Sequence, residues 1–198
     1  MINPMGWEIK QLEDNIVFLT SGSRGWSGYF ADDGEMFITI KNVKNGSILT
    51  DNVQYIHAPE TKEAERTRVK EGDLLISITA DLGRTGVVNA EIANYGAYIN
   101  QHLSLVRLDK TKINPYFVSH YLETDAGKKQ FESKNQFGVK AGLNFNAIKS
   151  LTVIVPPLEL QNRYISFMQQ TDKSKFAVMK QIKSTLTICT HYKILGGM

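Results

Sequence analysis

The sequence has few of the residues from which disulfides and metal centres are built. Cys189 is its only cysteine, so it cannot form an intrachain disulfide or a cysteine-rich zinc site. None of its four histidines is followed three or four residues later by a second histidine or a cysteine. These absences argue against a metalloenzyme and are typical of a protein in a reducing compartment.

Long apolar runs are missing as well. No segment approaches the roughly 20 apolar residues that a membrane-spanning helix needs. Met1–Lys10 lacks the basic and apolar regions of a signal peptide. We therefore expect a soluble, cytoplasmic protein. With 198 residues, the chain is long enough for one domain and an appendage.

The short motifs that hint at catalysis are incomplete. Asn114-Pro115-Tyr116-Phe117 lacks the second proline of an amino-methyltransferase loop, and helix capping explains it better. Glu8-Ile9-Lys10 and Glu60-Thr61-Lys62 each give half of a nuclease motif, without the upstream aspartate that would complete a metal site. The sequence thus predicts no catalytic and no metal-binding residues. A small nuclease or methyltransferase stays as the alternative to a non-catalytic protein.

Charge is distributed unevenly along the chain. The formal net charge is +3, but residues 1–60 carry four basic against eight acidic residues. Residues 61–155 carry thirteen against ten, and residues 156–198 carry six against two. A basic face suits a phosphate-binding protein. On charge alone, an ordinary solvated surface is the simpler interpretation.

Turn residues divide the N-terminal part into short apolar segments that are typical of strands. Met36–Ile40 lies between Asp32-Asp33-Gly34 and Asn45-Gly46, and Leu74–Thr79 follows a Glu-Gly-Asp turn. We also expect strands in Gly86–Val88, Ala97–Leu108 and Ser150–Val155, helices from Asn114-Pro115 to Leu122 and over Ala126–Phe131, and a loop over Asn135–Asn144. This order predicts an α+β fold with a β-rich globular domain and a few helices.

Pro156-Pro157 marks the clearest boundary, so we predict a domain at 1–155 and a long helix at 156–198. A helix of about 35 residues within this segment extends roughly 50 Å and cannot bury its apolar residues by itself. Its apolar residues follow a heptad spacing that polar Asp172 and Lys175 interrupt. We predict that this helix pairs with a partner helix as an antiparallel coiled coil. The alternative is a helix folded back on its own domain. The predicted seam residues are Ile165, Met168, Met179, Ile182, Leu186 and Cys189.

An ordered set of motifs resembles one known family. Trp7–Leu12 with Asp14 looks like the opening Trp-x-x-x-x-Leu-x-Asp of target recognition domains in type I restriction–modification specificity subunits. Val69–Ser77 resembles their Gly-Asp-Leu-Leu strand, and Asn100-Gln101-His102-Leu103 resembles their Asn-Gln-His strand. The family's Asn-Pro-x-Tyr/Phe helix and its Pro-Pro-Leu-x-x-Gln spacer start are matched at Asn114–Phe117 and Pro156–Gln161. The chain departs from the family at Leu160, where a glutamate usually stands.

The resemblance implies a non-catalytic subunit that reads double-stranded DNA and directs methylation and restriction by partner subunits. Those modification and restriction subunits are expected to hold S-adenosylmethionine, ATP and magnesium, and this chain no cofactor. A full specificity subunit usually has two recognition domains and two spacer helices, whereas this chain has one of each. The resemblance therefore implies a homodimer on inverted half-sites, or pairing with a second half-subunit. An orphan assembly protein without specific readout is a further alternative.

Candidate DNA contacts are polar and aromatic residues in predicted loops, because base edges are read by hydrogen bonds and backbones by cations. The first loop, Ser21–Tyr29, is rich in glycine, and its arginine suits bidentate pairing with guanine. A buried Trp26 in a surface turn is the alternative for this loop. The predicted DNA-binding residues are Ser23, Arg24, Trp26, Tyr29, Lys41, Asn42, Lys44, Arg84, Gln136, Lys140 and Asn144.

Overall fold

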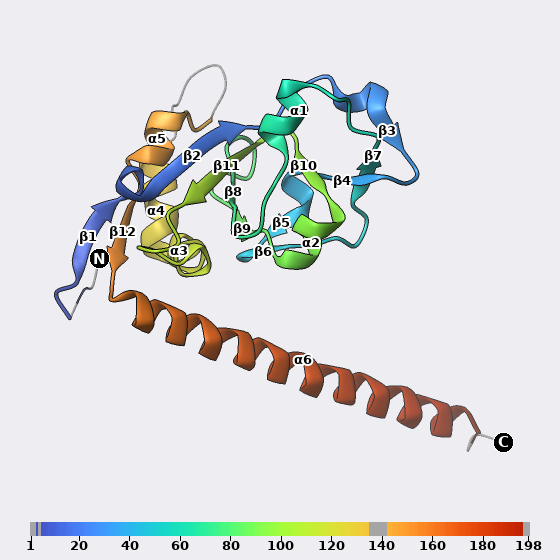
Figure 1. Ribbon diagram of the computed structural model, residues 1–198. Helices are drawn as coiled ribbons and strands as arrows, with labels where there is room; N and C mark the ends of the chain where they lie inside the picture. The colour runs from blue at the N-terminus through green and yellow to red at the C-terminus, as the bar shows by residue number, and fades with distance from the viewer. Residues whose placement is uncertain (1–2, 4, 135–141, 196–198) are drawn as a thin grey trace. The chain divides into compact units, whose positions relative to one another are not determined.

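The first of two four-stranded sheets is antiparallel and joins segments from distant parts of the sequence. The computed structural model (Figure 1) describes residue 3, residues 5–134 and residues 142–195, without the side chains of residues 176, 180, 181 and 183–195. The strand order is β2-β11-β8-β9. The strands are β2 (Ile16–Ser21), β11 (Leu103–Leu108), β8 (Leu74–Ser77) and β9 (Thr85–Val87).

Successive residues of β8 face two different hydrophobic clusters. Leu74 and Ile76 belong to one cluster and Leu75 to the other, and all three are fully buried. Side chains alternate between the two faces of a strand, so this sheet is covered on both faces. The continuous apolar run from Leu74 onward, which predicted a strand, has this physical origin.

The second four-stranded sheet is mixed and has the order β10-β4-β7-β3. Its β10 and β4 are parallel, and the other pairs are antiparallel. The predicted strand Met36–Ile40 ends at Ile38, because Thr39 and Asn42 form a capping box that starts a 3-10 helix. The strands are β10 (Ala97–Ile99), β4 (Glu35–Ile38), β7 (Gln54–Ile56) and β3 (Phe30–Ala31).

The prediction of one β segment over Ala97–Leu108 was too simple. The chain turns at Asn100, and β10 and β11 lie in different sheets. The side-chain oxygen of Asn100 accepts the backbone N–H of His102, and its carbonyl oxygen accepts the N–H of Leu103 at 3.1 Å. Asparagine favours such local turns. The sequence pattern placed the Asn-Gln-His motif in a strand, but Gln101 and His102 lie in this turn.

Two short sheets complete the first of the chain's two compact units, Met1–Leu158. β1 (Glu8–Gln11) pairs with β12 (Thr152–Val155), which brings the start of the chain beside the end of this unit (Figure 1). The second is formed by β5 (Val43–Lys44) and β6 (Ser47–Ile48).

The helices of the first unit begin at capping residues. Asn114, as predicted, accepts the backbone N–H of Tyr116 and starts α3 (Pro115–Leu122). The predicted second helix is α4 (Asp125–Lys134). The sequence analysis did not predict α1 (Lys62–Thr67), α2 (Ala90–Tyr95) or α5 (Phe145–Lys149).

The long C-terminal helix is confirmed as α6 (Leu158–Leu195), and it begins directly after Pro156-Pro157. The chain divides into two compact units, Met1–Leu158 and Glu159–Met198. With 38 residues, α6 extends roughly 57 Å. Within the part of the chain that the structure describes, no helix is both long and apolar enough to span a membrane. These elements confirm the predicted α+β fold, with a β-rich unit and a long C-terminal helix.

Candidate nucleic-acid interface

The root of the loop Ser21–Tyr29 is fixed by the backbone around it. Gly22 donates its N–H to the carbonyl oxygen of Leu103 at 3.0 Å, and Ser23 forms a bridge with Asn100. A side chain on Gly22 would collide with the carbonyl oxygen of Asn100. Glycine is therefore required here by close approach of two backbones. The loop and the Asn100–His102 turn meet at this point.

An arginine from outside the loop also holds this root. Arg66, on α1, donates to the carbonyl oxygen of Ser21 at 2.8 Å and to the hydroxyl of Thr20. Its second terminal nitrogen lies 3.5 Å from the hydroxyl of Ser23. Ser23 is buried and therefore not available to contact DNA, contrary to the prediction.

Trp26 is part of the hydrophobic core. Only 5% of its surface is exposed, and its ring stacks on Phe37 with ring centroids 5.4 Å apart. The ring centroid of Tyr98 lies 5.2 Å from that of Trp26. Burial raises the pKa of the Tyr98 phenol above its ordinary value, and the nearby Arg68 partly opposes this shift. Trp26 is therefore unavailable for stacking on a base, contrary to the prediction.

The tip of the same loop is exposed. Gly25 has a φ of +77°, which glycine adopts without strain, and the next residues form a one-turn 3-10 helix, Trp26–Tyr29. Arg24 is exposed and has no ion pair among the described residues. Tyr29 is 42% exposed. Arg24 and Tyr29 thus keep the positions expected of residues that contact a ligand.

A hollow of about 530 Å³ gathers polar side chains from three separate segments. Lys41, one of the predicted DNA contacts, lines it together with Asn100 and His102. The adjacent Asn42 also lines it, but its amide is occupied: it accepts the N–H of Thr39 at 2.9 Å and donates to Leu49. Asn42 is 5% exposed, so its main role is to shape the hollow.

The sequence analysis did not predict that His102 lines this hollow. Its ring is held on both sides, by Thr79 at 2.7 Å through Nδ1 and by the amide of Gln101 at 3.1 Å through Nε2. Asn52 and Gln54 also line the hollow. These residues are far apart in the sequence, and only pairing of β4 with β7 and β10 brings them together. The ring nitrogens of His102 and the side-chain nitrogen of Gln54 are already bonded within the protein, so the exposed Lys41 and Asn52 are better suited to hydrogen bonds with base edges.

Residues 4–187 match the family described as the type I restriction modification DNA specificity domain. The chain belongs to this family. It is 23% identical over 192 residues to the MjaX type I restriction enzyme specificity subunit of Methanocaldococcus jannaschii, covering 91% of this chain and 43% of that protein. It is 20% identical over 154 residues to the EcoBI specificity subunit of Escherichia coli, covering 78% of this chain and 32% of that protein.

Solved structures agree with this assignment at the level of the fold. The HsdS subunit from Thermoanaerobacter tengcongensis matches with a TM-score of 0.61 and 18% identity, over 91% of this chain and 40% of that one. The S subunit from M. genitalium matches with a TM-score of 0.59 and 10% identity, over 87% and 41%. The chain thus spans about one third to two fifths of the length of the relatives it resembles.

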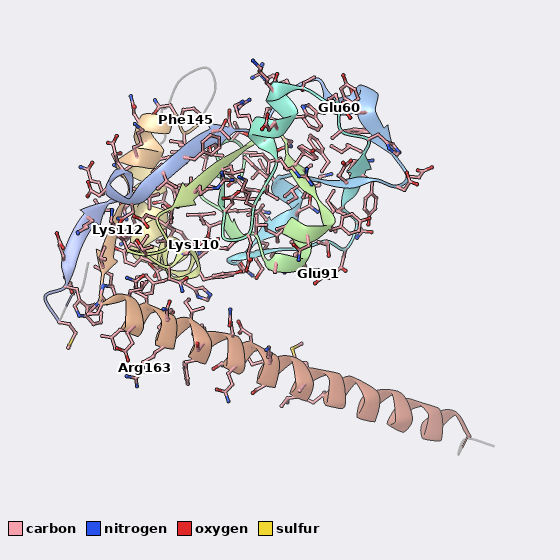
Figure 2. The ribbon with its side chains drawn as sticks, in the orientation of Figure 1. Glu60, Glu91, Lys110, Lys112, Phe145 and Arg163 are labelled. Atoms are coloured by element: carbon pink, nitrogen blue, oxygen red, sulfur yellow. The ribbon has the colours of Figure 1, made fainter. Side chains whose placement is uncertain are left out.

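The other predicted DNA contacts of the specificity domain lie outside the hollow. Lys44, on β5, is exposed, whereas Arg84 is half-buried and paired with Asp81 at 2.6 Å. Asn144 caps α5 by accepting the N–H of Ala147 at 2.8 Å, and the neighbouring Phe145 lies at the surface (Figure 2). Gln136 and Lys140 lie outside the described residues.

The residues predicted to form the seam of α6 differ in exposure. Met179 and Ile182 are 60% and 53% exposed. Met168 is half-buried, and Ile165 is buried. The side chains of Leu186 and Cys189 lie outside the described part of the chain. Exposed apolar side chains thus occur in both halves of α6: Tyr164 and Phe167 lie in the first half, and Val178 lies beside the two exposed seam residues in the second.

Proposed function

We propose that this specificity domain recognises a DNA sequence for a type I restriction–modification complex and carries out no reaction itself. The observation that carries this proposal is the family match, which extends over the globular unit and most of α6. The exposed Arg24 and Lys41 and the polar hollow support it, because they suit contacts to bases and phosphates. Arg24 is the first candidate for direct base reading.

We also propose that two α6 helices pair in an antiparallel manner, those of two copies or of this chain and a second half-subunit. The exposed Met179 and Ile182, both at predicted seam positions, support this pairing, since apolar side chains at heptad spacing gain by burial against another helix. A two-fold homodimer would present two recognition units to inverted half-sites. In the complex, separate methyltransferase and restriction subunits would hold S-adenosylmethionine, ATP and magnesium.

Selection from a library of random DNA duplexes tests the recognition proposal. We expect the full chain, alone or mixed with a methyltransferase subunit of such a system, to enrich a short sequence in two inverted copies. Enrichment of a single, unrepeated sequence would contradict the homodimer but leave recognition intact. If sequencing finds no enrichment in either mixture, the recognition proposal is wrong.

Replacing Arg24 by alanine is expected to relax the preference at one base position of each half-site. A bidentate arginine–guanine pair contributes roughly 1–3 kcal/mol of discrimination, so competing bases at that position should gain about 5- to 150-fold relative to the parent. Competition binding with single-base variants of the selected site measures this. Arg24→Lys is the matched control, because it keeps the charge and loses the forked geometry. Should lysine restore binding to all sequences equally, Arg24 contacts a phosphate instead.

A further inference from the structure

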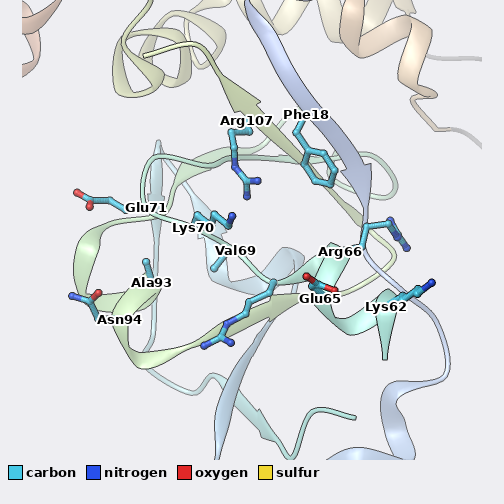
Figure 3. A pocket seen from close by; sticks show the side chains of 11 residues that line it. Phe18, Lys62, Glu65, Arg66, Val69, Lys70, Glu71, Ala93, Asn94 and Arg107 are labelled. Carbon is cyan, nitrogen blue, oxygen red and sulfur yellow. The ribbon is translucent and has the colours of Figure 1, made fainter. Parts of the chain in front are cut away.

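A second hollow in the first unit is lined by more cations than carboxylates. Its volume is about 750 Å³, and it lies against α1, the segment that follows α1, and the strands β2 and β11 (Figure 3). None of the residues predicted from the sequence as DNA contacts lines it. Five cations and two carboxylates do: Lys62, Arg66, Arg68, Lys70, Arg107, Glu65 and Glu71.

The local backbone explains why several of these cations share one face. After α1 ends at Thr67, the chain is extended: Arg68 forms a bridge with Tyr98, and Val69 donates to the carbonyl oxygen of Ala97 at 3.0 Å. Thr67 and Val69 are buried, whereas the alternate residues Arg68 and Lys70 are exposed. This period of two is that of a strand with one buried face.

Two of the five cations are held in place by other groups of the protein. Arg107 makes two hydrogen bonds of 2.7 Å to the carboxylate of Asp73, whose side chain is 1% exposed, and its guanidinium lies 5.2 Å from the ring centroid of Phe18. Arg66 pairs weakly with Glu63 at 3.5 Å and holds the root of the loop at Ser21. These two arginines form a fixed wall of the hollow.

The other three cations have no such partner. Among the described residues, no ion pair involves Lys62, Arg68 or Lys70. All three are exposed. Glu65 and Glu71 lower the local positive charge without cancelling it, since cations outnumber carboxylates around the hollow. A site with free cations and an open surface suits an extended polyanion.

We infer that this hollow binds the phosphate backbone of the duplex whose bases the loop Ser21–Tyr29 reads. Lys62, Arg68 and Lys70 contact phosphates, and Arg66 connects the hollow to the loop through its bonds to Ser21 and Ser23. Phosphate contacts fix the register of a protein on DNA, and base contacts specify the sequence. The inference rests on the proposed function in one respect, that the polyanion is duplex DNA.

The salt dependence of binding to a random-sequence duplex tests this inference. Each phosphate contact contributes about 0.9 to the slope of log K against log salt concentration. We expect the full-chain variant with Lys62→Gln, Arg68→Gln and Lys70→Gln to lose about 2–3 from this slope per bound protomer. Its affinity at 0.1 M salt should fall on the order of 100-fold, equally for all sequences. Fluorescence anisotropy with a labelled duplex measures both quantities.

A matched variant removes three cations elsewhere, with Lys112→Gln, Lys128→Gln and Lys129→Gln. All three lysines are exposed, and none lines the hollow. Lys112 lies at the opposite end of the first unit from Glu60, which precedes α1 (Figure 2). This variant should keep nearly the parental slope. Thermal melting of both variants checks folding, and single Lys62→Gln and Lys70→Gln variants, each expected to lose about 1 from the slope, replace the triple variant if it does not fold.

The outcomes separate this inference from the proposed function. If the parent selects a sequence but the hollow variant keeps the parental slope, the inference is overturned and the recognition proposal stands. If binding to random duplexes depends on the hollow but no sequence is selected, the inference about the hollow stands and the recognition proposal is wrong. Saturable binding of inorganic phosphate that the triple variant loses, without a change in DNA binding, would overturn the duplex assignment. A parent that binds no duplex at low salt overturns it as well.

Discussion

Replacing both Met179 and Ile182 by aspartate is expected to convert a dimer of this specificity domain into monomers. Both side chains are more than half exposed and lie three residues apart on α6. Charges at two seam positions of paired helices would lie in an apolar interface without partners, which is strongly unfavourable. Light scattering of the purified full chain measures the change in mass.

The same substitutions are expected to weaken binding to a selected two-part site by about 100-fold or more. A dimer binds its second half-site as an intramolecular step, and this multivalency contributes 10²–10⁴-fold to affinity. A monomer loses it without losing any contact to a single half-site. Affinity for a duplex that contains one half-site should therefore be unchanged.

Ser174→Asp combined with Ala177→Asp provides the matched control for this prediction. It adds the same two charges, at the same spacing, to exposed residues of the same helix outside the seam positions. The control should remain dimeric and bind like the parent. A Met179/Ile182 variant that keeps the parental mass would disprove the proposed pairing through these residues.

Replacing Trp26 by alanine is expected to lower the free energy of unfolding by roughly 3–5 kcal/mol, the usual cost of removing a large buried aromatic side chain. The ring of Trp26 contacts the rings of Phe37 and Tyr98, so its removal takes away both contacts. Urea unfolding followed by circular dichroism measures the change. Trp26 anchors the loop that carries Arg24 in the core. Discrimination between DNA sequences by the variant should therefore also decrease as the urea concentration approaches its unfolding midpoint.

Tyr29→Ala distinguishes this structural role from a DNA contact. Tyr29 is an exposed aromatic residue on the same 3-10 helix, with its ring centroid 6.2 Å from that of Trp26. Its loss should change the unfolding free energy by less than about 1 kcal/mol. Should Trp26→Ala leave stability unchanged and abolish DNA binding, Trp26 would be a base-stacking residue after all.

Local signals in the sequence were sufficient for elements that have their own start and stop. Asn114-Pro115 predicted the start of α3, and Pro156-Pro157 predicted the start of α6, because capping and the missing proline N–H act within one turn. The apolar run at Leu74 predicted β8 for a similar reason. The heptad spacing predicted the long helix but not which of its apolar residues are exposed.

Most of the predictions that were wrong or missing concern contacts between residues that are distant in the sequence. Composition cannot distinguish a tryptophan that lines a loop from one that stacks on Phe37. Asn42 failed for a local reason: it was predicted as a DNA contact, but its side chain is bonded to the nearby Thr39 and Leu49. The basic hollow combines α1 with Arg107, forty residues further along. The alternation of Arg66, Arg68 and Lys70 was its one visible signal.

The loop Ser21–Tyr29 combines a fixed root with an exposed tip, and this has a consequence for how target preference can change. At the root, Gly22 tolerates no side chain, and Arg66 and Trp26 hold the backbone. At the tip, substitutions of Arg24 affect no bond within the described protein and should cost less than about 0.5 kcal/mol of stability. With the proposed role of Arg24 in base reading, new preferences would arise by single substitutions at the tip, while the fold and the proposed phosphate-binding hollow stay the same.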